Sequence, residues 1–125
     1  MALPLGLCNQ VKLEVTEQDT AAAVGSGDVP VLATPRLIAL CEQASTEALR
    51  AHLVDGQTSV GFRVEVTHLV PVLVGSVVLA TASLERVEGK RVIFNVTVTD
   101  RCGLVAAGRV TRVVVTTGAF MEKAR

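Results

Sequence analysis

A histidine at the end of a predicted strand is the first residue of this sequence that could take part in chemistry. Neutral imidazole serves as a general base near pH 7. The alternation of apolar and polar residues before His68 is typical of a half-buried strand, so we expect His68 to point toward the covered face, where the sheet can open to a cavity. A lone histidine on an apolar face is also commonly a hydrogen-bonded core residue, and that interpretation stays open. The apolar residues that set this register are Val60, Phe62, Val64 and Val66.

Glu42 is the carboxylate best placed to assist such a base. It lies at the border of the apolar face of a predicted helix, next to Ile38, Ser45 and Leu49. A carboxylate at this border is commonly a solvated edge residue. In a cleft that largely excludes water, however, a carboxylate can activate a water molecule or act on a carbonyl carbon.

Thr34 begins the same helix and adds a hydroxyl group. Because Pro35 follows it, the simplest role of Thr34 is that of the N-cap; alternatively, its hydroxyl serves a site at the mouth of the helix. Thr34 and Glu42 are eight residues apart, about 12 Å along a regular helix, so two helical residues of one chain at these positions cannot share a hydrogen bond. Either Thr34 lies off the helix, which Pro35 favours, or the site combines residues of two subunits. We expect a site at a two-fold interface.

Three further residues are weaker candidates. His52 falls near the end of the helix, where the helix dipole accounts for it without a function. Cys41 is expected to be a small core residue, with a nucleophilic role as the alternative. Arg112 falls in register with the apolar residues Val110 and Val114 and could pair with a buried acid or with a ligand phosphate. The sequence assigns no role to it.

The composition limits the classes of protein to which these residues can belong. The 125 residues include twelve basic and twelve acidic side chains, and three Phe with no Trp or Tyr. Nucleic-acid binding requires an excess of basic side chains and commonly uses aromatic ones, so nucleic acid is not expected as a partner. Half of the residues are hydrophobic, which excludes disorder and favours an apolar surface covered by another subunit.

Cysteine usage and hydropathy indicate a reducing, aqueous compartment. Cys8, Cys41 and Cys102 are too few and too scattered for a disulfide framework or a cysteine-based zinc site. The apolar residues at the start are too short for a signal peptide and lack its basic beginning. The most apolar stretch, residues 69–80, is interrupted by Pro and Gly and is shorter than the roughly 20 residues of a spanning helix. We therefore expect a cytoplasmic protein that does not contact a membrane.

The order of the predicted elements indicates an α+β fold. Residues 11–15 alternate as a strand, and residues 16–31 are expected to form a short helical turn and a loop. A long helix is expected over residues 34–53, about 28 Å and enough to cross a sheet. Tight turns between the later strands make neighbours antiparallel, so we expect one domain over residues 1–125, with one helix packed on a curled antiparallel sheet of about five strands and a tail from residue 118. The four later strands are expected at residues 60–68, 77–87, 91–99 and 104–116.

Several short motifs follow one another between residues 33 and 117. They are Ala33-Thr34-Pro35, Glu42, Ser59-Val60-Gly61, Val66-Thr67-His68 and Val87-Glu88-Gly89-Lys90-Arg91. Taken together, these motifs resemble the fluoroacetyl-CoA thioesterase family of the hot dog fold. The resemblance implies a homodimer in which each sheet wraps its own long helix and the two sheets join edge to edge.

The same resemblance implies acyl-CoA hydrolysis carried by Thr34, Glu42 and His68. No metal and no cofactor is expected, since coenzyme A is part of the substrate. His68 would act as general base or proton shuttle, Glu42 would activate water or attack the carbonyl, and Thr34 would orient them. Gly61 would line the position of the attacking water or the thioester oxygen. A glycine inside a strand often marks a close approach of this kind, although a bulge also accounts for one.

The acyl group and the activity stay open at this point. The fluoroacetate-specific form of the family has Phe residues ahead of the helix, whereas residues 1–33 here contain none. A short or medium acyl-CoA, or an acyl group on a carrier protein, is therefore expected as readily as fluoroacetyl-CoA. The alternative functions are those of a hot dog hydratase or dehydratase and of a non-catalytic module that binds acyl-CoA or another apolar ligand.

Overall fold

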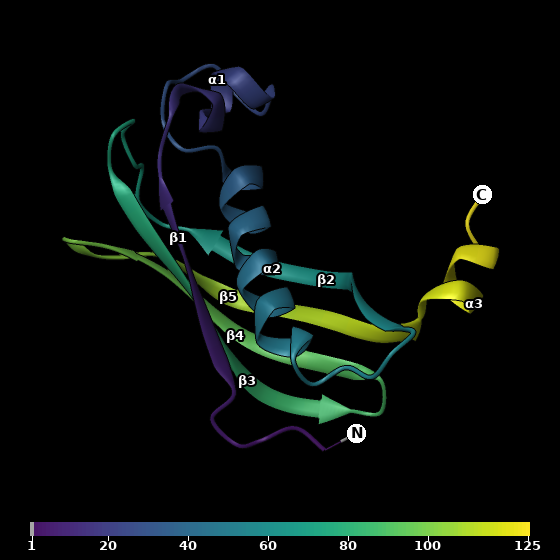
Figure 1. Ribbon diagram of the computed structural model, residues 1–125. Coiled ribbons are helices and arrows are strands. Elements are labelled where there is room, and N and C mark those ends of the chain that lie inside the picture. The colour runs from purple at the N-terminus through teal and green to yellow at the C-terminus, as the bar shows by residue number, and fades with distance from the viewer. Residues whose placement is uncertain (1) are drawn as a thin grey trace.

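A five-stranded antiparallel sheet and one long helix make up most of the structure (Figure 1). The computed structural model describes residues 2–125. The order of strands in the sheet is β1-β3-β4-β5-β2, and every neighbouring pair is antiparallel. The predicted α+β class is confirmed. The strands are β1 (Cys8–Glu14), β2 (Gln57–His68), β3 (Val77–Glu88), β4 (Arg91–Asp100) and β5 (Gly103–Thr116).

The long helix α2 (Thr34–Arg50) runs across one face of the curled sheet (Figure 1). It is three residues shorter than predicted, because the chain turns at residues 51–52 before the loop that leads to β2. The apolar face of α2 packs against the inward residues of the sheet, of which Phe94 is the largest that is fully buried. The buried residues of α2 are Leu37, Leu40, Cys41, Ala44, Ser45, Ala48 and Leu49.

Three short helices complete the chain. The segment between β1 and α2 contains a 3-10 turn η1 (Glu17–Asp19) and a helix α1 (Ala21–Val24). This agrees with the short helical turn and loop predicted for residues 16–31. Where a tail was expected, α3 (Thr117–Glu122) follows β5 and projects away from the sheet (Figure 1). Within residues 2–125, no helix combines the length and the apolar character that crossing a bilayer requires.

The expectation that each later strand pairs with the next is wrong at one connection. The β3–β4 and β4–β5 connections are tight turns, but β2 pairs with β5, and β3 pairs with β1. Residues 69–76 therefore cross from one side of the sheet to the other. The crossing passes the start of α2, where the Leu32 amide donates to the Val72 carbonyl at 2.8 Å. As a result, β2 forms one edge of the sheet.

A β-bulge changes which residues of β2 face the helix. Gly61 and Arg63 pair with adjacent residues of β5, so Phe62 is an extra residue in the strand. Gly61 and His68 both lie opposite buried residues of β5 and share the covered face, whereas Phe62 is 56% exposed. The predicted register, which put Val60 and Phe62 on the same face as His68, is therefore wrong on the N-terminal side of the bulge.

Candidate active site

Thr34 and His68 form a polar pair where the end of β2 meets the start of α2. Oγ1 of Thr34 and Nδ1 of His68 share a hydrogen bond of 2.8 Å. The prediction that Thr34 is the N-cap is wrong, because Ala33 occupies that position in an extended conformation and Thr34 is the first helical residue. The Thr34 hydroxyl binds the imidazole instead of the helix backbone.

The second ring nitrogen of His68 is not satisfied within the described chain. Nε2 is buried and has no hydrogen-bond partner among residues 2–125. Buried polar atoms are nearly always hydrogen-bonded, and an exception is often explained by a catalytic role. A ring held at Nδ1 with Nε2 unpaired can exchange a proton with a bound molecule.

An aliphatic cavity of about 330 Å³ adjoins the Thr34–His68 pair. Its volume is near the lower end of small-molecule sites, which span roughly 300–1,000 Å³. None of the three Phe residues borders it. Besides Thr34 and His68, the cavity is lined by Ala21, Ser26, Gly27, Val29, Val31, Leu32, Pro35, Leu69, Val70 and Pro71.

Glu42 forms a second polar group further along α2, against the middle of β2. Its Oε2 accepts a hydrogen bond from Nη1 of Arg112 at 3.4 Å, and the Glu42 side chain is about one-third exposed. Gly61 leaves the space that this carboxylate occupies, since a Cβ atom built on Gly61 would lie 2.5 Å from Glu42 Oε2. The close approach expected at Gly61 is thus made by the Glu42 carboxylate, with a bulge beside it.

The structure brings Thr34 to His68 and Glu42 to Gly61, but it does not bring the two pairs together within one chain. Thr34 and Glu42 are both helical, which leaves about 12 Å between them along α2. The residues of β5 that pair with Gly61 and His68 are six positions apart, about 20 Å along the strand. The alternative in which Thr34 lies off the helix is therefore excluded, because Thr34 begins α2.

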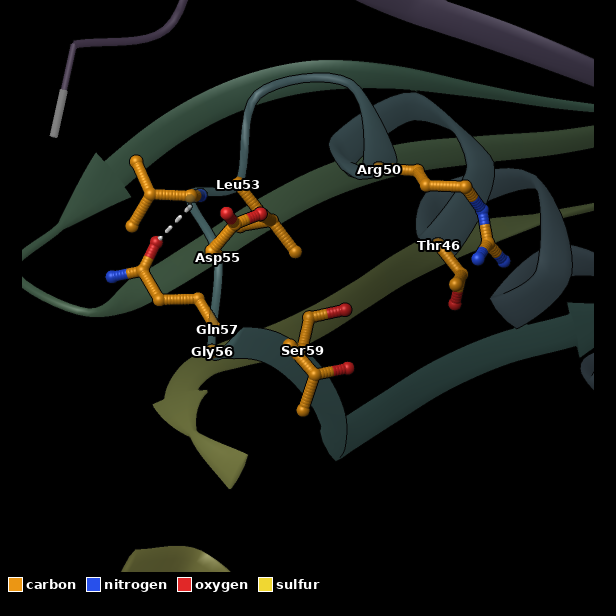
Figure 2. Close-up of a pocket in the computed structure, with 9 residues that line it drawn as sticks. Thr46, Arg50, Leu53, Asp55, Gly56, Gln57 and Ser59 are labelled. Atoms are coloured by element: carbon orange, nitrogen blue, oxygen red, sulfur yellow. Dashed lines mark hydrogen bonds between the residues drawn. The ribbon is translucent and has the colours of Figure 1, made fainter. Parts of the chain in front are cut away.

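A polar cavity of about 290 Å³ adjoins the Glu42 group on the side away from His68. Figure 2 shows Thr46 and Arg50 of α2 on one side of it and Ser59 of β2 on the other. The loop between them is held by Gln57, whose side-chain oxygen accepts from the Val54 amide at 3.2 Å (Figure 2). This cavity meets the Arg112–Glu42 pair through Ser59, which accepts a hydrogen bond from Arg112, and Glu42 does not line it.

The remaining candidates lie away from these groups. Cys41 is fully buried in the core, and burial together with the nearby Glu42 raises the pKa of its thiol to about 11. A thiol of this kind is not a nucleophile at neutral pH. His52 is exposed beyond the end of α2, as the helix-dipole interpretation expects. Among residues 2–125, no three His, Cys, Asp or Glu side chains gather where they could hold a metal ion.

Sequence reasoning left Arg112 unassigned and missed Ser59 as a functional candidate. Arg112 is a buried cation that donates to both Ser59 and Glu42. The signal in the sequence was its register with the apolar residues Val110 and Val114, which indicates a charge on the covered face. The choice between an acid and a ligand phosphate as its partner needed the fold, because Glu42 lies 70 residues away in the chain.

Comparison with known proteins places the chain in a defined family. A model of the fluoroacetyl-CoA-specific thioesterase family matches residues 15–118. A fluoroacetyl-CoA thioesterase of Streptantibioticus cattleyicolor is 33% identical over 95 residues, which cover 76% of this chain and 68% of that protein.

Solved structures agree with the sequence matches. A fluoroacetyl-CoA thioesterase superposes with a TM-score of 0.92 and 27% identity, over the whole of this chain and 97% of the other. A thioesterase superfamily member from Thermus thermophilus gives 0.90 and 28%, over 97% and 90% of the two chains. A hot-dog-like protein from Thermanaerovibrio acidaminovorans gives 0.89 and 32%, over 96% and 89%.

The helix on its curled sheet and these neighbours define a hot dog protein of the thioesterase superfamily. Within that class, the chain belongs to the fluoroacetyl-CoA-specific thioesterase family. The sequence-based predictions of the family, of the fold and of an acyl-CoA thioesterase activity are confirmed.

Proposed function

We propose that the enzyme hydrolyses short or medium acyl-CoA thioesters at a site shared by two copies of the chain, with Thr34, Glu42 and His68 as its catalytic residues. The observation that carries this proposal is the imidazole of His68. Thr34 holds it at Nδ1, its Nε2 has no partner among residues 2–125, and it lies beside an aliphatic cavity. This arrangement suits a general base next to the binding space for an acyl group.

The edge strand β2 supports a two-fold arrangement. Its outer edge has no partner strand in the described chain, and a 12-residue unpaired edge invites pairing with another strand. In an antiparallel pair of two β2 strands centred near Glu65, Gly61 would lie opposite His68 of the partner subunit, on the same face of the joined sheet. The Glu65 carboxylates of the two subunits would then lie close together. Arg63, which forms an ion pair with Glu65 at 2.9 Å, would offset their repulsion.

Such a pairing would complete two equivalent sites. Each would take the Thr34–His68 pair from one subunit and the Glu42–Gly61 group from the other, as an isologous interface requires. The Thr34–His68 pair and the Glu42–Gly61 group lie far apart within one chain, but those of two different chains would then lie next to each other. The homodimer is thus part of the proposed mechanism.

The proposed reaction adds water to the thioester carbonyl and releases free coenzyme A. If Nδ1–H of His68 donates to Thr34 Oγ1, the lone pair of Nε2 can take a proton from the attacking water. That proton then passes to the departing thiolate sulfur. A backbone N–H near Gly61 would polarise the carbonyl oxygen. Glu42 would orient the water, or attack the carbonyl carbon directly to give an anhydride that water opens.

The lining of the cavity supports a small aliphatic acyl group. The residues of the segment 25–32 that border it are Ser26, Gly27, Val29, Val31 and Leu32, none of which is aromatic. A structure of the related fluoroacetyl-CoA thioesterase holds fluoroacetate and CoA, and another holds acetyl-CoA. For the present chain we propose an acyl group of this size or a few carbons longer.

The three free cysteines support a reducing compartment. Cys8 and Cys102 are exposed and Cys41 is buried, and none of them forms a disulfide in the described chain. We therefore propose a cytoplasmic enzyme.

A panel of acyl-CoAs followed with a thiol reagent tests the proposed function. We expect the purified protein to release thiol from at least one short or medium acyl-CoA. We expect His68→Ala to reduce the rate by about 100-fold or more, the usual range for loss of a general base, with the oligomeric state unchanged. His52→Ala is the matched control and should behave as wild type, because His52 is exposed and lies beyond the end of α2, away from His68. Unchanged turnover in His68→Ala would contradict the assignment.

A further inference from the structure

Arg112 is a buried cation that the proposed reaction does not yet use. Only 7% of its surface is exposed. Its Nε donates to Ser59 Oγ at 2.9 Å, and its Nη2 donates to the Ser59 carbonyl oxygen at 3.0 Å. Its Nη1 donates to Glu42 Oε2 at 3.4 Å.

Burying a guanidinium is costly unless it is paired and hydrogen-bonded. Burial lowers the pKa of Arg112 from its ordinary value, whereas the charge and the hydrogen bond of Glu42 act in the opposite direction. Ser59 contributes two neutral acceptors, so the charge is offset by Glu42 alone. Among residues 2–125, this is also the one ion pair that Glu42 makes.

The position of Arg112 in the sheet fixes where it holds the carboxylate. Arg112 pairs directly with Gly61 across the β2–β5 ladder. A Cβ atom on Gly61 would lie 2.5 Å from Glu42 Oε2 and 3.8 Å from Arg112 Nη1. The glycine, the arginine and the carboxylate are therefore in contact, and the two bonds to Ser59 prevent the guanidinium from turning away.

We propose that Arg112, fixed by Ser59, is a positioning residue that holds the Glu42 carboxylate against Gly61 for thioester hydrolysis. This inference rests on the proposed function. Arg112 acts through Glu42, because the anchored guanidinium limits the orientations that the carboxylate can take. The groups that face Glu42 from the sheet are Gly61, which carries no charge, and Arg112, while Cys41 adjoins it on α2.

Variants at position 112 separate charge from geometry. In Arg112→Gln we expect kcat to fall by about tenfold or more with KM within about twofold, because orientation of the carboxylate is lost while the substrate contacts remain. Arg112→Lys keeps the charge but not the fork, so its kcat should also fall, with KM near that of wild type.

Two further variants control for folding and for surface charge. Ser59→Ala removes one of the two anchors and should give a smaller fall in kcat, which keeps the proposal testable if Arg112→Gln does not fold. Arg109→Gln is the matched control, because Arg109 lies on the exposed face of the same strand and pairs with Glu85 at 3.1 Å. Its kcat and KM should match those of wild type.

Other outcomes would overturn the inference. A raised KM with unchanged kcat in Arg112→Gln would mean that Arg112 binds the substrate directly. A wild-type kcat in Arg112→Gln, or in Ser59→Ala where the first variant does not fold, would mean that the position of Glu42 does not depend on this network.

The inference can be tested separately from the proposed function. If the wild-type enzyme cleaves no acyl-CoA, the proposed function fails. The crystal structure of Arg112→Gln, or of Ser59→Ala, then decides the present inference alone. A Glu42 carboxylate that has left Gly61 supports it, and an unmoved carboxylate contradicts it.

Discussion

At the scale of single residues, a substitution at Gly61 is expected to lower activity with little change in stability. In Gly61→Ala the new methyl group would overlap Glu42 Oε2, which is the far end of a flexible side chain. The carboxylate can shift aside while it stays paired with the buried Arg112, at little cost in folding free energy, but it then leaves the position proposed for catalysis. We expect kcat to fall by about tenfold or more, with a change of less than about 1 kcal/mol in the free energy of unfolding.

The control for this prediction is Gly118→Ala. Gly118 has open space around its Cβ position and lies in α3, away from the site, so both kcat and stability should stay near wild type. Urea unfolding and steady-state kinetics on the two variants make the comparison. A Gly61→Ala enzyme with normal kcat would show that Glu42 does not need its place on the glycine.

At the scale of elements, periodicity predicted which segments are helix and strand but not how β2 is built. The long helix and the later strands follow from the 3.6 and 2.0 residue repeats, which reflect burial on one face. The bulge at Phe62 leaves no such signal, because the residues on both sides of it are apolar at alternate positions. For this reason strict alternation separated Gly61 from the face of His68, whereas the structure puts them on one face.

The same limit applies to the polar groups of the site. The helical spacing of Thr34 and Glu42 was sufficient to show that they cannot meet within one helix. The hydrogen bond from Thr34 to His68 and the ion pair from Glu42 to Arg112 join residues 34 and 70 positions apart in the chain. Such contacts depend on the pairing of β2 with β5, which the apolar pattern of the strands does not encode.

The segment before α2 contains an ionic anchor whose strength depends on pH. Although burial opposes it, hydrogen bonds from the Thr16 amide and hydroxyl and from Arg36 lower the pKa of Asp19 below 3.8. A lowered pKa stabilises the fold above the pKa of the unfolded state, and the contribution is lost as pH falls through the folded value. We expect Asp19→Asn to lower the free energy of unfolding by about 1–3 kcal/mol at pH 7.

This destabilisation should shrink as the pH falls below 3.8 and through the lowered pKa of the folded state, where the wild-type carboxylate becomes protonated. Urea unfolding between pH 3 and pH 8 measures it. Asp28→Asn, at an exposed position of the same segment, is the control and should stay within about 0.5 kcal/mol of wild type at every pH. A constant difference between wild type and Asp19→Asn across this range would contradict the pH-dependent anchor.

At the scale of the whole molecule, the shared site predicts that two inactive variants restore activity when they are mixed. In the proposed symmetric dimer, His68→Ala and Glu42→Gln each damage both sites, because every site would take one of these residues from each subunit. In a mixed dimer, one site carries both changes and the other carries neither. Random exchange makes about half of the dimers mixed, so about one quarter of all sites, and of the wild-type activity, should return.

If all three residues of a site came from one chain, every site in the mixture would still carry one change and the activity would stay at the level of the separate variants. Thiol release after the two proteins are unfolded and refolded together, compared with each refolded alone, distinguishes the two arrangements.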